Sequence, residues 1–310
     1  MAMTLVEAAK LSTDVLLKGV IETIITESQL LKHLPFIDIV GNGLTYNQEN
    51  TLPTAGFYDV GDTWTESTPT FTQQTATLKI LGGDADVDEF LRQTRSNIQN
   101  LKAIVTELKS KSIARKFEDT AVYGDTSSDT KSFNGLHKLV SSGTTHQVHA
   151  GTDATPAAGS VRKLKQLCRL VMPGDPDFLV MSRTTLDNLS DYAERNYSPI
   201  KFTVDQFGKP IGYFKGVPVI TTDWILQTEA ISSSIYSAKT GGTATSIFAV
   251  KFGEKALSGC QNGGIQVKDL GDLETKDASR TRIKWYASMA LFNTLSLARY
   301  DGITDEAWGA

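Results

Sequence analysis

The sequence contains very little cysteine. Among its 310 residues only Cys168 and Cys260 carry thiols, too few for the disulfide framework that stabilises small secreted domains. Such sparse use of cysteine is typical of a protein made in a reducing cytoplasm. Either thiol is equally well explained as a core residue.

An excess of positive charge is also missing. Thirty-one Lys and Arg residues stand against thirty-five Asp and Glu residues, which gives a formal net charge of -4. Proteins that grip nucleic acid over a broad face carry a basic excess, because each phosphate contact needs a cation. The composition argues against such a face, although a polymer can be enclosed without being gripped.

Long apolar runs are absent as well. No segment reaches the roughly 18 uninterrupted apolar residues that a membrane helix needs. The first residues include Glu7 and Asp14 among apolar ones and lack a small-residue cleavage site, unlike a secretory signal. We expect no membrane partner, and synthesis and assembly in the cytoplasm.

Catalytic and metal-binding motifs are missing too. The sequence has no G-x-S-x-G, H-E-x-x-H or G-x-x-x-x-G-K-S pattern. The close pair His146 and His149 has no third ligand at a convincing spacing, so we interpret it as part of a solvated loop. Asp125 and Asp129 lie in a loop rich in Gly, Ser and Asp. We predict no catalytic, cofactor or metal site and no enzyme; a small-oligomer hydrolase using Ser, His and Asp is the alternative of a different class.

The segment TWTESTPTFTQQTATLKI, residues 63–80, has strong β character but little to bury. Seven threonines favour extended chain, whereas only Trp64, Phe71, Leu78 and Ile80 offer sizeable apolar surface. Two β-like stretches, 44–49 and 70–81, flank a region rich in Gly, Pro, Asp and Thr, which predicts a two-stranded excursion. An isolated hairpin is only marginally stable. The excursion therefore needs a partner.

Two amphipathic helical segments flank this excursion. The first, residues 4–34, carries Leu16 and Val20 on its apolar side and ends before Pro35. In the second, apolar residues alternate steps of four and three, which predicts one long helix from about residue 84 to 121. Aspartates crowd its start and basic residues its end, as the helix dipole favours. We expect its core side to comprise Leu91, Ile98, Leu101, Val105 and Leu108.

The second half alternates helices and strands, so the fold class is α+β. The pattern predicts helices at 161–171 and 183–196 and strands between and after them. The segment 280–303 reads as one last strand, with Ile283, Trp285, Ala287, Met289 and Leu291 on one face.

The order of these elements resembles the major capsid proteins of tailed bacteriophages, the HK97-like capsid fold. Asn134, Gly135 and Leu136 in SFNGLHKLV are similar to that family's entry into its axial domain. FLVMSRTTLDNL, GVPVITTDW and IKWYASMALFNTLSLARYDGI are similar to later elements. The resemblance implies five parts: an N-terminal arm at 1–43, an extended β loop at 44–82, a spine helix and peripheral domain at 83–135, an axial α/β domain at 136–270, and a returning strand of the peripheral domain with the C-terminus at 271–310.

The resemblance also implies the function and the partners. Copies of the chain would form hexamers and pentamers of an icosahedral virion capsid that encloses double-stranded DNA without sequence-specific binding. Portal and decoration proteins are further possible partners, and we expect a separate scaffolding protein or none. The loop would lie over the adjacent subunit; candidate contacts are Phe57, Tyr58, Trp64 and Phe71, with Leu16 and Val20 in the arm. An encapsulin, a bacterial shell that encloses a cargo enzyme, has the same architecture and is the alternative within this class.

One residue type is missing from the loop itself, and this generates a prediction. In the type member of the family a loop lysine forms an isopeptide bond with an asparagine of a neighbour, but residues 44–78 contain no lysine and the first is Lys79. Neither arginine nor threonine can replace that amine. We expect mature particles boiled in reducing detergent to release a single band near 33.7 kDa. A ladder of multimers that survives boiling would contradict noncovalent assembly.

Overall fold

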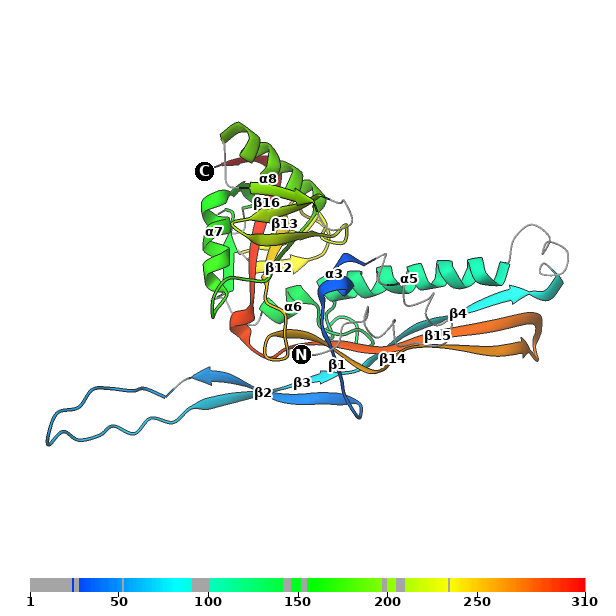
Figure 1. Cartoon of the computed structure of the whole chain (residues 1–310), viewed down its shortest axis with the longest axis horizontal. Helices are drawn as coiled ribbons and strands as arrows, with labels where there is room; N and C mark the ends of the chain where they lie inside the picture. Colours follow the sequence, from blue (N-terminus) through cyan, green and yellow to red (C-terminus); the bar gives the residue numbers. More distant parts are fainter. Residues whose placement is uncertain are drawn as a thin grey trace.

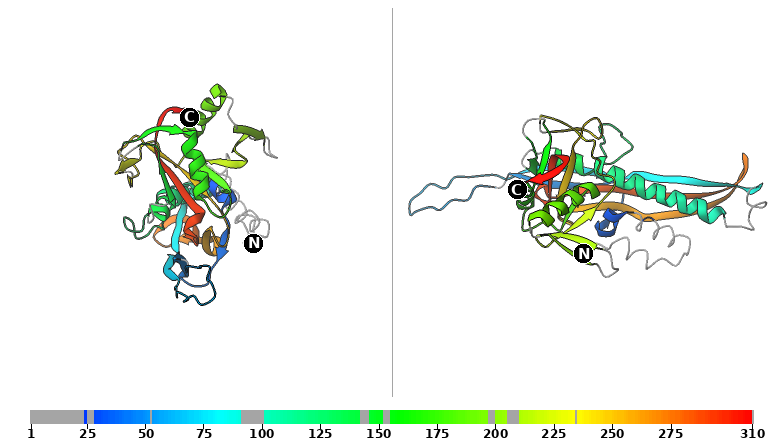
Figure 2. Two further views of the ribbon diagram at one scale, coloured as in Figure 1. Left: turned by 90° about the vertical axis from the view of Figure 1, so that its left-hand side faces the viewer. Right: turned by 90° about the horizontal axis from the view of Figure 1, so that it is seen from above.

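A computed structural model gives the arrangement of the chain. It describes residues 24, 28–51, 53–90, 101–141, 146–151, 155–196, 200–204, 210–233 and 235–309. An upper domain stands on a long limb, and a thin hairpin leaves the corner in the opposite direction (Figure 1). Seen from above, hairpin and limb again point in opposite directions (Figure 2).

A four-stranded sheet with one helix forms the limb. The strand order is β1, β14, β15, β4, with β1 parallel to β14 and the other neighbours antiparallel. The bounds are Phe36–Asp38 for β1, Leu257–Leu273 for β14, Lys276–Leu291 for β15 and Lys79–Asp88 for β4. Helix α5, Leu101–Tyr123, runs beside β4 and β15 (Figure 1). None of the helices in the described ranges is long and apolar enough to cross a membrane.

The predicted start of the long helix is wrong, because residues 79–88 form strand β4. Ala85 and Val87 are buried on one side, while Asp84 and Asp86 bond across the ladder to the guanidinium groups of Arg282 and Arg280 at 2.7–2.8 Å. These bonds hold the pKa of both carboxyl groups below the usual range. The aspartates therefore serve cross-strand pairing, not a helix dipole.

The buried face of α5 also differs from the predicted one. Leu108 is 60% exposed and Val105 is half-buried, so Leu108 is not a core residue of this subunit. The buried side lies one position further along the helix and begins with two polar residues, Thr106 and Ser110, followed by Ile113, Ala114, Phe117 and Ala121. The hydroxyls of Thr106 and Ser110 bond to carbonyls one turn earlier, which makes their burial possible. Leu101 is the first residue of α5, and Leu91 and Ile98 lie outside the described residues.

Aromatic side chains form the core where limb and upper domain meet. The ring of Trp285 in β15 packs on Phe117 of α5 at 4.8 Å and on Phe36 of β1 at 5.3 Å, and Phe133 contacts Phe117 at 5.5 Å. The predicted inner face of β15 is confirmed, since every second residue from Ile283 to Leu291 is buried. The short helix α3, Gln29–His33, joins this core, and Ser28 at its N-cap donates to the buried Glu118 carboxylate of α5 at 2.7 Å.

The upper domain is built on an eight-stranded sheet. The order is β5, β16, β13, β7, β10, β9, β8, with β6 also paired to β16. Helices α7, Val161–Leu170, and α8, Arg183–Asn196, bury their apolar sides in one core cluster of this domain. The strand bounds are Gln147–His149 for β5, Ala157–Ser160 for β6, Phe178–Met181 for β7, Ile200–Val204 for β8, Pro210–Phe214 for β9, Val217–Thr221 for β10, Thr245–Val250 for β13 and Leu297–Gly309 for β16. The short helix α6, Leu136–Ser141, and a ribbon of β11, Ala230–Ser232, and β12, Ile235–Ala238, lie at its lower edge.

The boundaries expected for the last two parts need correction. Strand β14 belongs to the limb sheet from Leu257 onward, so the axial part does not continue to 270. The segment 280–303 is two strands separated by a 3₁₀ turn, Thr294–Ser296, and the second of them, β16, lies inside the upper sheet. The Asn293 side chain accepts a hydrogen bond from the Leu295 backbone N–H at the start of this turn. This cap interrupts the alternating strand pattern and changes the direction of the chain.

The aromatic junction predicts a large difference between two positions of α5. Phe117→Ala should destabilise the unassembled subunit by about 3 to 5 kcal/mol, because Phe117 is fully buried between Phe36 and Trp285. Leu108→Ala, the matched control on the exposed side, should change it by less than about 0.5 kcal/mol. Denaturant unfolding of both variants measures this, and equal losses would contradict the assigned face.

Candidate subunit-contact site

The hairpin is the most exposed ordered part of the chain. Strands β2, Gly43–Thr51, and β3, Thr70–Thr77, pair antiparallel from Gly43 opposite Thr77 to Thr51 opposite Thr70. The predicted two-stranded excursion is confirmed, with its second strand ending at Thr77 because the chain passes into β4 at Lys79. Beyond the paired strands the hairpin extends away from the rest of the subunit (Figures 1 and 2).

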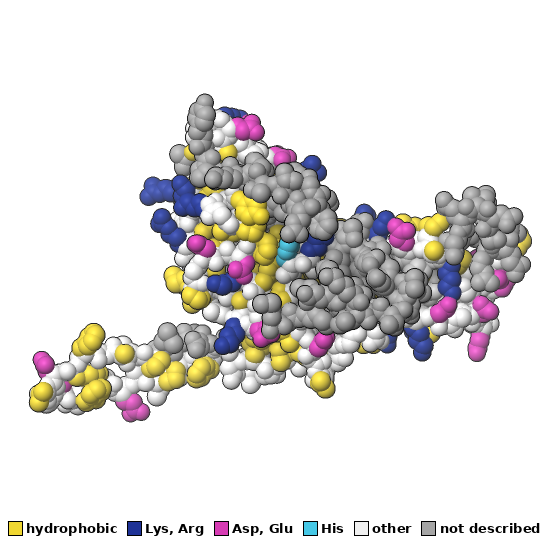
Figure 3. Space-filling model, viewed as in Figure 1, with side chains coloured by type: hydrophobic (Ala, Val, Ile, Leu, Met, Phe, Trp, Pro, Cys, Tyr) yellow, Lys and Arg dark blue, Asp and Glu magenta, His cyan; other side chains and the backbone are white. Residues whose placement is uncertain are grey.

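Aromatic side chains of the hairpin are exposed to an unusual degree. Phe57 is 109%, Trp64 78% and Phe71 61% exposed. Tyr58 is half-buried because its ring stacks on Trp64 at 4.4 Å. Apolar side chains recur along the hairpin in the space-filling view (Figure 3). Leu16 and Val20, the candidates in the arm, lie outside the described residues.

The base of the hairpin, by contrast, is anchored in the subunit. Ala76 is buried in a small cluster with Ile39, Cys260 and Ala290. The ring of Tyr46 packs on Phe292 at 4.8 Å. The base of the hairpin is therefore anchored to the limb, whereas its outer end is exposed to solvent.

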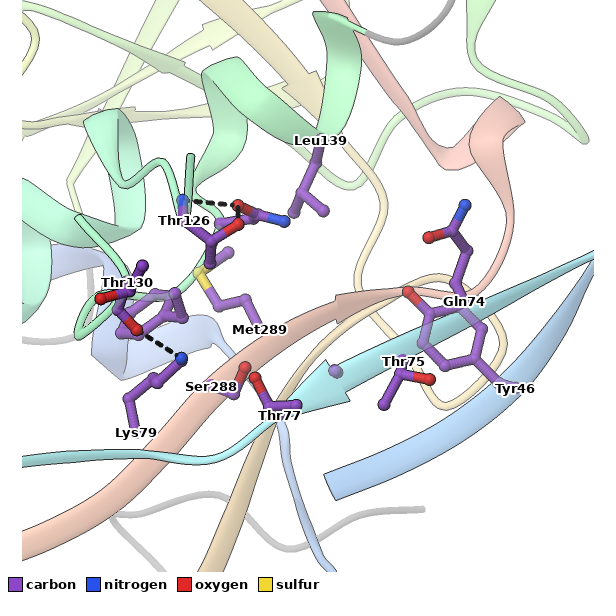
Figure 4. A pocket seen from close by; sticks show the side chains of 13 residues that line it. Tyr46, Gln74, Thr75, Thr77, Lys79, Thr126, Thr130, Leu139, Ser288 and Met289 are labelled. Atoms are coloured by element: carbon purple, nitrogen blue, oxygen red, sulfur yellow. Dashed lines mark hydrogen bonds between the residues drawn. The ribbon is translucent and has the colours of Figure 1, made fainter. Parts of the chain in front are cut away.

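A polar pocket of about 310 Å³ lies beside this base. It opens between β3, the end of β15 and the loop that follows α5 (Figure 4). The Lys79 ammonium at its rim donates to the Thr130 carbonyl at 2.6 Å, and Asn134 accepts from the Thr126 backbone and hydroxyl. Its walls are hydroxyls, amides and a few apolar groups, suited to seating a polar side chain. They are Tyr46, Gln74, Thr75, Ala76, Thr77, Lys79, Thr126, Thr130, Phe133, Asn134, Leu139, Ser288 and Met289.

His149 and Asp125, two of the polar residues considered for chemistry, have structural partners. His149 lies in β5, not in a solvated loop as predicted, and its Nδ1 is 2.5 Å from the buried Asp301 carboxylate. Asp125 accepts from the Ser127 backbone at 2.8 Å and pairs with Lys138. Within the described stretches no three His, Cys, Asp or Glu residues are grouped to hold a metal ion.

A buried charged network at the junction is the feature that the sequence analysis missed. The Glu229 carboxylate next to β11 is fully buried and accepts from Tyr123, His137 and Ser246 at 2.8, 2.9 and 2.5 Å. His137 of α6 lies between the rings of Tyr123 and Tyr236, at 4.9 and 4.1 Å. Burial lowers the pKa of His137, and the hydrogen bonds and positive neighbours hold the pKa of Glu229 below its usual range. No motif or spacing signals this network, because its members come from distant segments.

A second buried pair continues the network into the upper sheet. Arg299 and Asp301 of β16 are both fully buried and bond at 2.5 Å. The guanidinium of Arg299 also lies 5.3 Å from the Tyr236 ring. A buried charge is tolerated only when paired, so the network fixes how α6, β12 and β16 meet.

Comparison with known proteins identifies the family. The model of the Phage capsid family matches residues 12–291. This chain belongs to the phage capsid family. It is a structural shell protein with the HK97-like fold that the element order predicted, and its copies form a multimeric shell. No curated protein matches the sequence significantly.

Solved structures carry the same fold at low sequence identity. The encapsulin SrpI of Synechococcus elongatus PCC 7942 is 17% identical, with a TM-score of 0.69 over 100% of this chain and 99% of that one. The capsid of a native GTA particle is 12% identical, with a TM-score of 0.65 over 90% and 91%. A Mycobacterium phage Bobi chain is 14% identical, with a TM-score of 0.60 over 91% of both chains. At these identities the likeness shows the fold.

The buried network predicts how subunit stability depends on pH. Because the pKa of His137 is lowered in the folded subunit, the unfolded chain takes up a proton first as the pH falls below the ordinary value of 6.5. Stability should therefore decline by up to about 1.4 kcal/mol per pH unit below that value from this group. Glu229, with a lowered pKa, adds a loss only at lower pH, whereas Asp301, whose pKa burial raises, opposes both.

The variant His137→Gln isolates the histidine contribution. Glutamine can still donate a hydrogen bond to Glu229 but does not titrate. The melting temperature of the variant should therefore fall less than that of the wild type between about pH 7 and 5. Identical profiles for wild type and His137→Gln would contradict the assignment.

Proposed function

We propose that this chain is the major capsid protein of a tailed bacteriophage. Its copies close into an icosahedral shell of hexamers and pentamers around double-stranded DNA, and they assemble in the host cytoplasm. The observation that carries the proposal is the hairpin, a paired and anchored element whose Phe57, Trp64 and Phe71 side chains remain mostly exposed in the described structure.

A neighbouring subunit supplies the cover that the hairpin lacks. Phe57 and Trp64 are exposed near the outer end, and burying aromatic side chains of this size contributes roughly 1.5 to 3 kcal/mol each. Phe71 lies in the paired strand β3, opposite Glu49 of β2, and would contact the same neighbour. In this arrangement one face of the hairpin lies on the adjacent subunit, and Tyr58 stays stacked on Trp64. The arm residues Leu16 and Val20 are proposed as a second contact of the same kind.

The other proposed partners are those that a purely structural shell protein requires. The chain has no enzymatic role in this proposal, and a separate scaffolding protein, or none, guides assembly. A portal and decoration proteins complete the virion. The DNA is held by enclosure, in keeping with the formal net charge of -4.

An encapsulin-like compartment is the second candidate, favoured by the full-length match to the Synechococcus elongatus encapsulin. The two candidates differ in content. Particles purified from the natural source and treated with nuclease should contain protected double-stranded DNA. Particles that instead contain one cargo protein and no nucleic acid would favour the compartment.

Shortening the hairpin tests the contact directly. Replacing residues 53–69 by Asn-Gly joins β2 and β3 through a short turn. This variant should keep the melting temperature of the unassembled subunit within a few degrees, because the removed segment contacts little of its own chain. It should form no closed particles in electron micrographs.

A matched pair of point variants separates side-chain burial from hairpin length. The double variant Phe57→Ala and Trp64→Ala should assemble poorly, whereas Thr54→Ala should assemble like the wild type. Normal shells from the shortened hairpin would show that the hairpin is not an assembly contact.

A further inference from the structure

Helix α7 carries a row of cations that have no partner among the described residues. Arg162 and Arg169 are exposed and Lys165 between them is half-buried, at spacings of three and four residues, on the side away from the buried Leu164 and Cys168. The helix contains no acidic residue. In the part of the chain that the structure describes, none of the three cations forms an ion pair or a hydrogen bond. Basic side chains gather at this edge of the upper domain in the space-filling view (Figure 3).

Helix α8 carries an acidic row on its own exposed side. Asp187, Asp191 and Glu194 are exposed, opposite the buried Thr185 and Leu189. Asp187 and Glu194 form no ion pair with described residues. Asp191 pairs with the exposed Arg195 one turn away, and such surface pairs are weak enough to exchange partners.

The two rows match in length and in spacing. Each spans eight residues, or seven residue steps, about 10 Å along a helix. Along α7 the steps are three and then four residues; along α8, read backwards from Glu194, the steps are again three and then four. Placed antiparallel, Arg162 would face Glu194, Lys165 would face Asp191 and Arg169 would face Asp187.

The rows cannot meet within one subunit but can meet between subunits. Helix α7 lies at the left edge of the upper domain and α8 at its top (Figure 1), and no ion pair joins the two helices in the described structure. Two different complementary faces on one chain make a head-to-tail contact, which generates rings when the rotation closes.

We propose that the basic row of α7 binds the acidic row of α8 on the next copy of this chain, antiparallel, and so sets the head-to-tail contact of upper domains within each ring of the shell. This inference rests on the proposed shell function. A nucleic-acid ligand fits the basic row less well, because three cations over about 10 Å form a small patch, and the neighbouring helix α8 places exposed carboxylates in the same domain.

Reversing the charges of one row tests the contact, and reversing both rows together should restore it. The variant Arg162→Glu, Lys165→Glu, Arg169→Glu should lower the yield of closed particles by at least about tenfold. The variant Asp187→Lys, Asp191→Lys, Glu194→Lys should do the same. A chain with all six changes restores opposite charges and should regain particles. The double variant Arg162→Lys, Arg169→Lys, which keeps the charge, is the control and should assemble normally.

Mixing the two triple variants gives a sharper result. In a mixture each chain can pair only with the other kind, so rings with an even number of members close and rings with an odd number cannot. Hexameric sheets or tubes should form, and closed shells, which need pentamers, should not. Circular dichroism and melting of each unassembled variant verify that the subunits fold.

The outcomes distinguish a contact between subunits from a role in holding nucleic acid. Normal shells from either triple variant would overturn the proposal, and so would failure of the folded six-change chain to regain particles. Normal shells with reduced DNA content from the α7 variant would assign the basic row to nucleic acid. A wild-type chain that forms no shell at all would overturn the proposed function instead.

Discussion

The burial of Trp285 is the interaction on which the rest of the subunit depends. Its ring packs on Phe117 from the helix and on Phe36 from the first strand, and its indole nitrogen donates to Gln261 in β14 at 3.2 Å. Four segments far apart in the sequence therefore meet around one side chain. Without this core the limb would be a flat sheet and a separate helix with no common interior. The limb can be long and thin because its stability is concentrated at this junction.

The apolar side chains of the hairpin fall into two groups, one buried against the limb and one exposed. Ala76, Tyr46 and their neighbours fix the hairpin base to the limb, while Phe57 and Trp64 stay uncovered. A monomeric protein would gain nothing from ordering such a hairpin, since each residue costs roughly 1 to 2 kcal/mol in backbone entropy. The free energy that orders the outer part must come from outside the subunit. In the proposed capsid, copies of the same chain are that source.

The sequence allowed the order of elements to be predicted because period, turn residues and strand character are local signals. It misplaced the start of the long helix because Val87 fits a period of two as well as one of 3.6. The decisive fact, the bonding of Asp84 and Asp86 to arginines almost 200 positions away, is not local. Leu108 was assigned to the core for a related reason. Periodicity finds an apolar stripe but cannot tell whether the subunit or its neighbour covers it.

The candidate site was predictable in part for the same reason. The exposed hairpin could be inferred, since TWTESTPTFTQQTATLKI offers too little apolar surface to be a core element. The Glu229 network could not, because Tyr123, His137 and Ser246 have no common spacing and each is an ordinary residue alone. Nor does alternation reveal that β16 carries a buried Arg299 and Asp301 into the upper sheet, since both occupy positions where apolar residues are usual.

The buried network and the charged helices bear on one geometric problem, which is how a ring closes. A head-to-tail contact produces a ring only if the angle between its two faces is held within narrow limits. Both α7 and α8 pack on the core around β16, and β16 carries Arg299 and Asp301 into the network that holds α6 and β12. Sliding of the upper domain on the limb would break the hydrogen bond from Tyr123 of α5 to the buried Glu229 carboxylate, and a buried charged group that loses a hydrogen-bond partner costs about 1 to 3 kcal/mol or more. Exposed ion pairs, in contrast, are weak and tolerant of small shifts. In the proposed shell, rigid orientation inside the subunit and adjustable contacts between subunits would let one chain occupy both hexameric and pentameric rings.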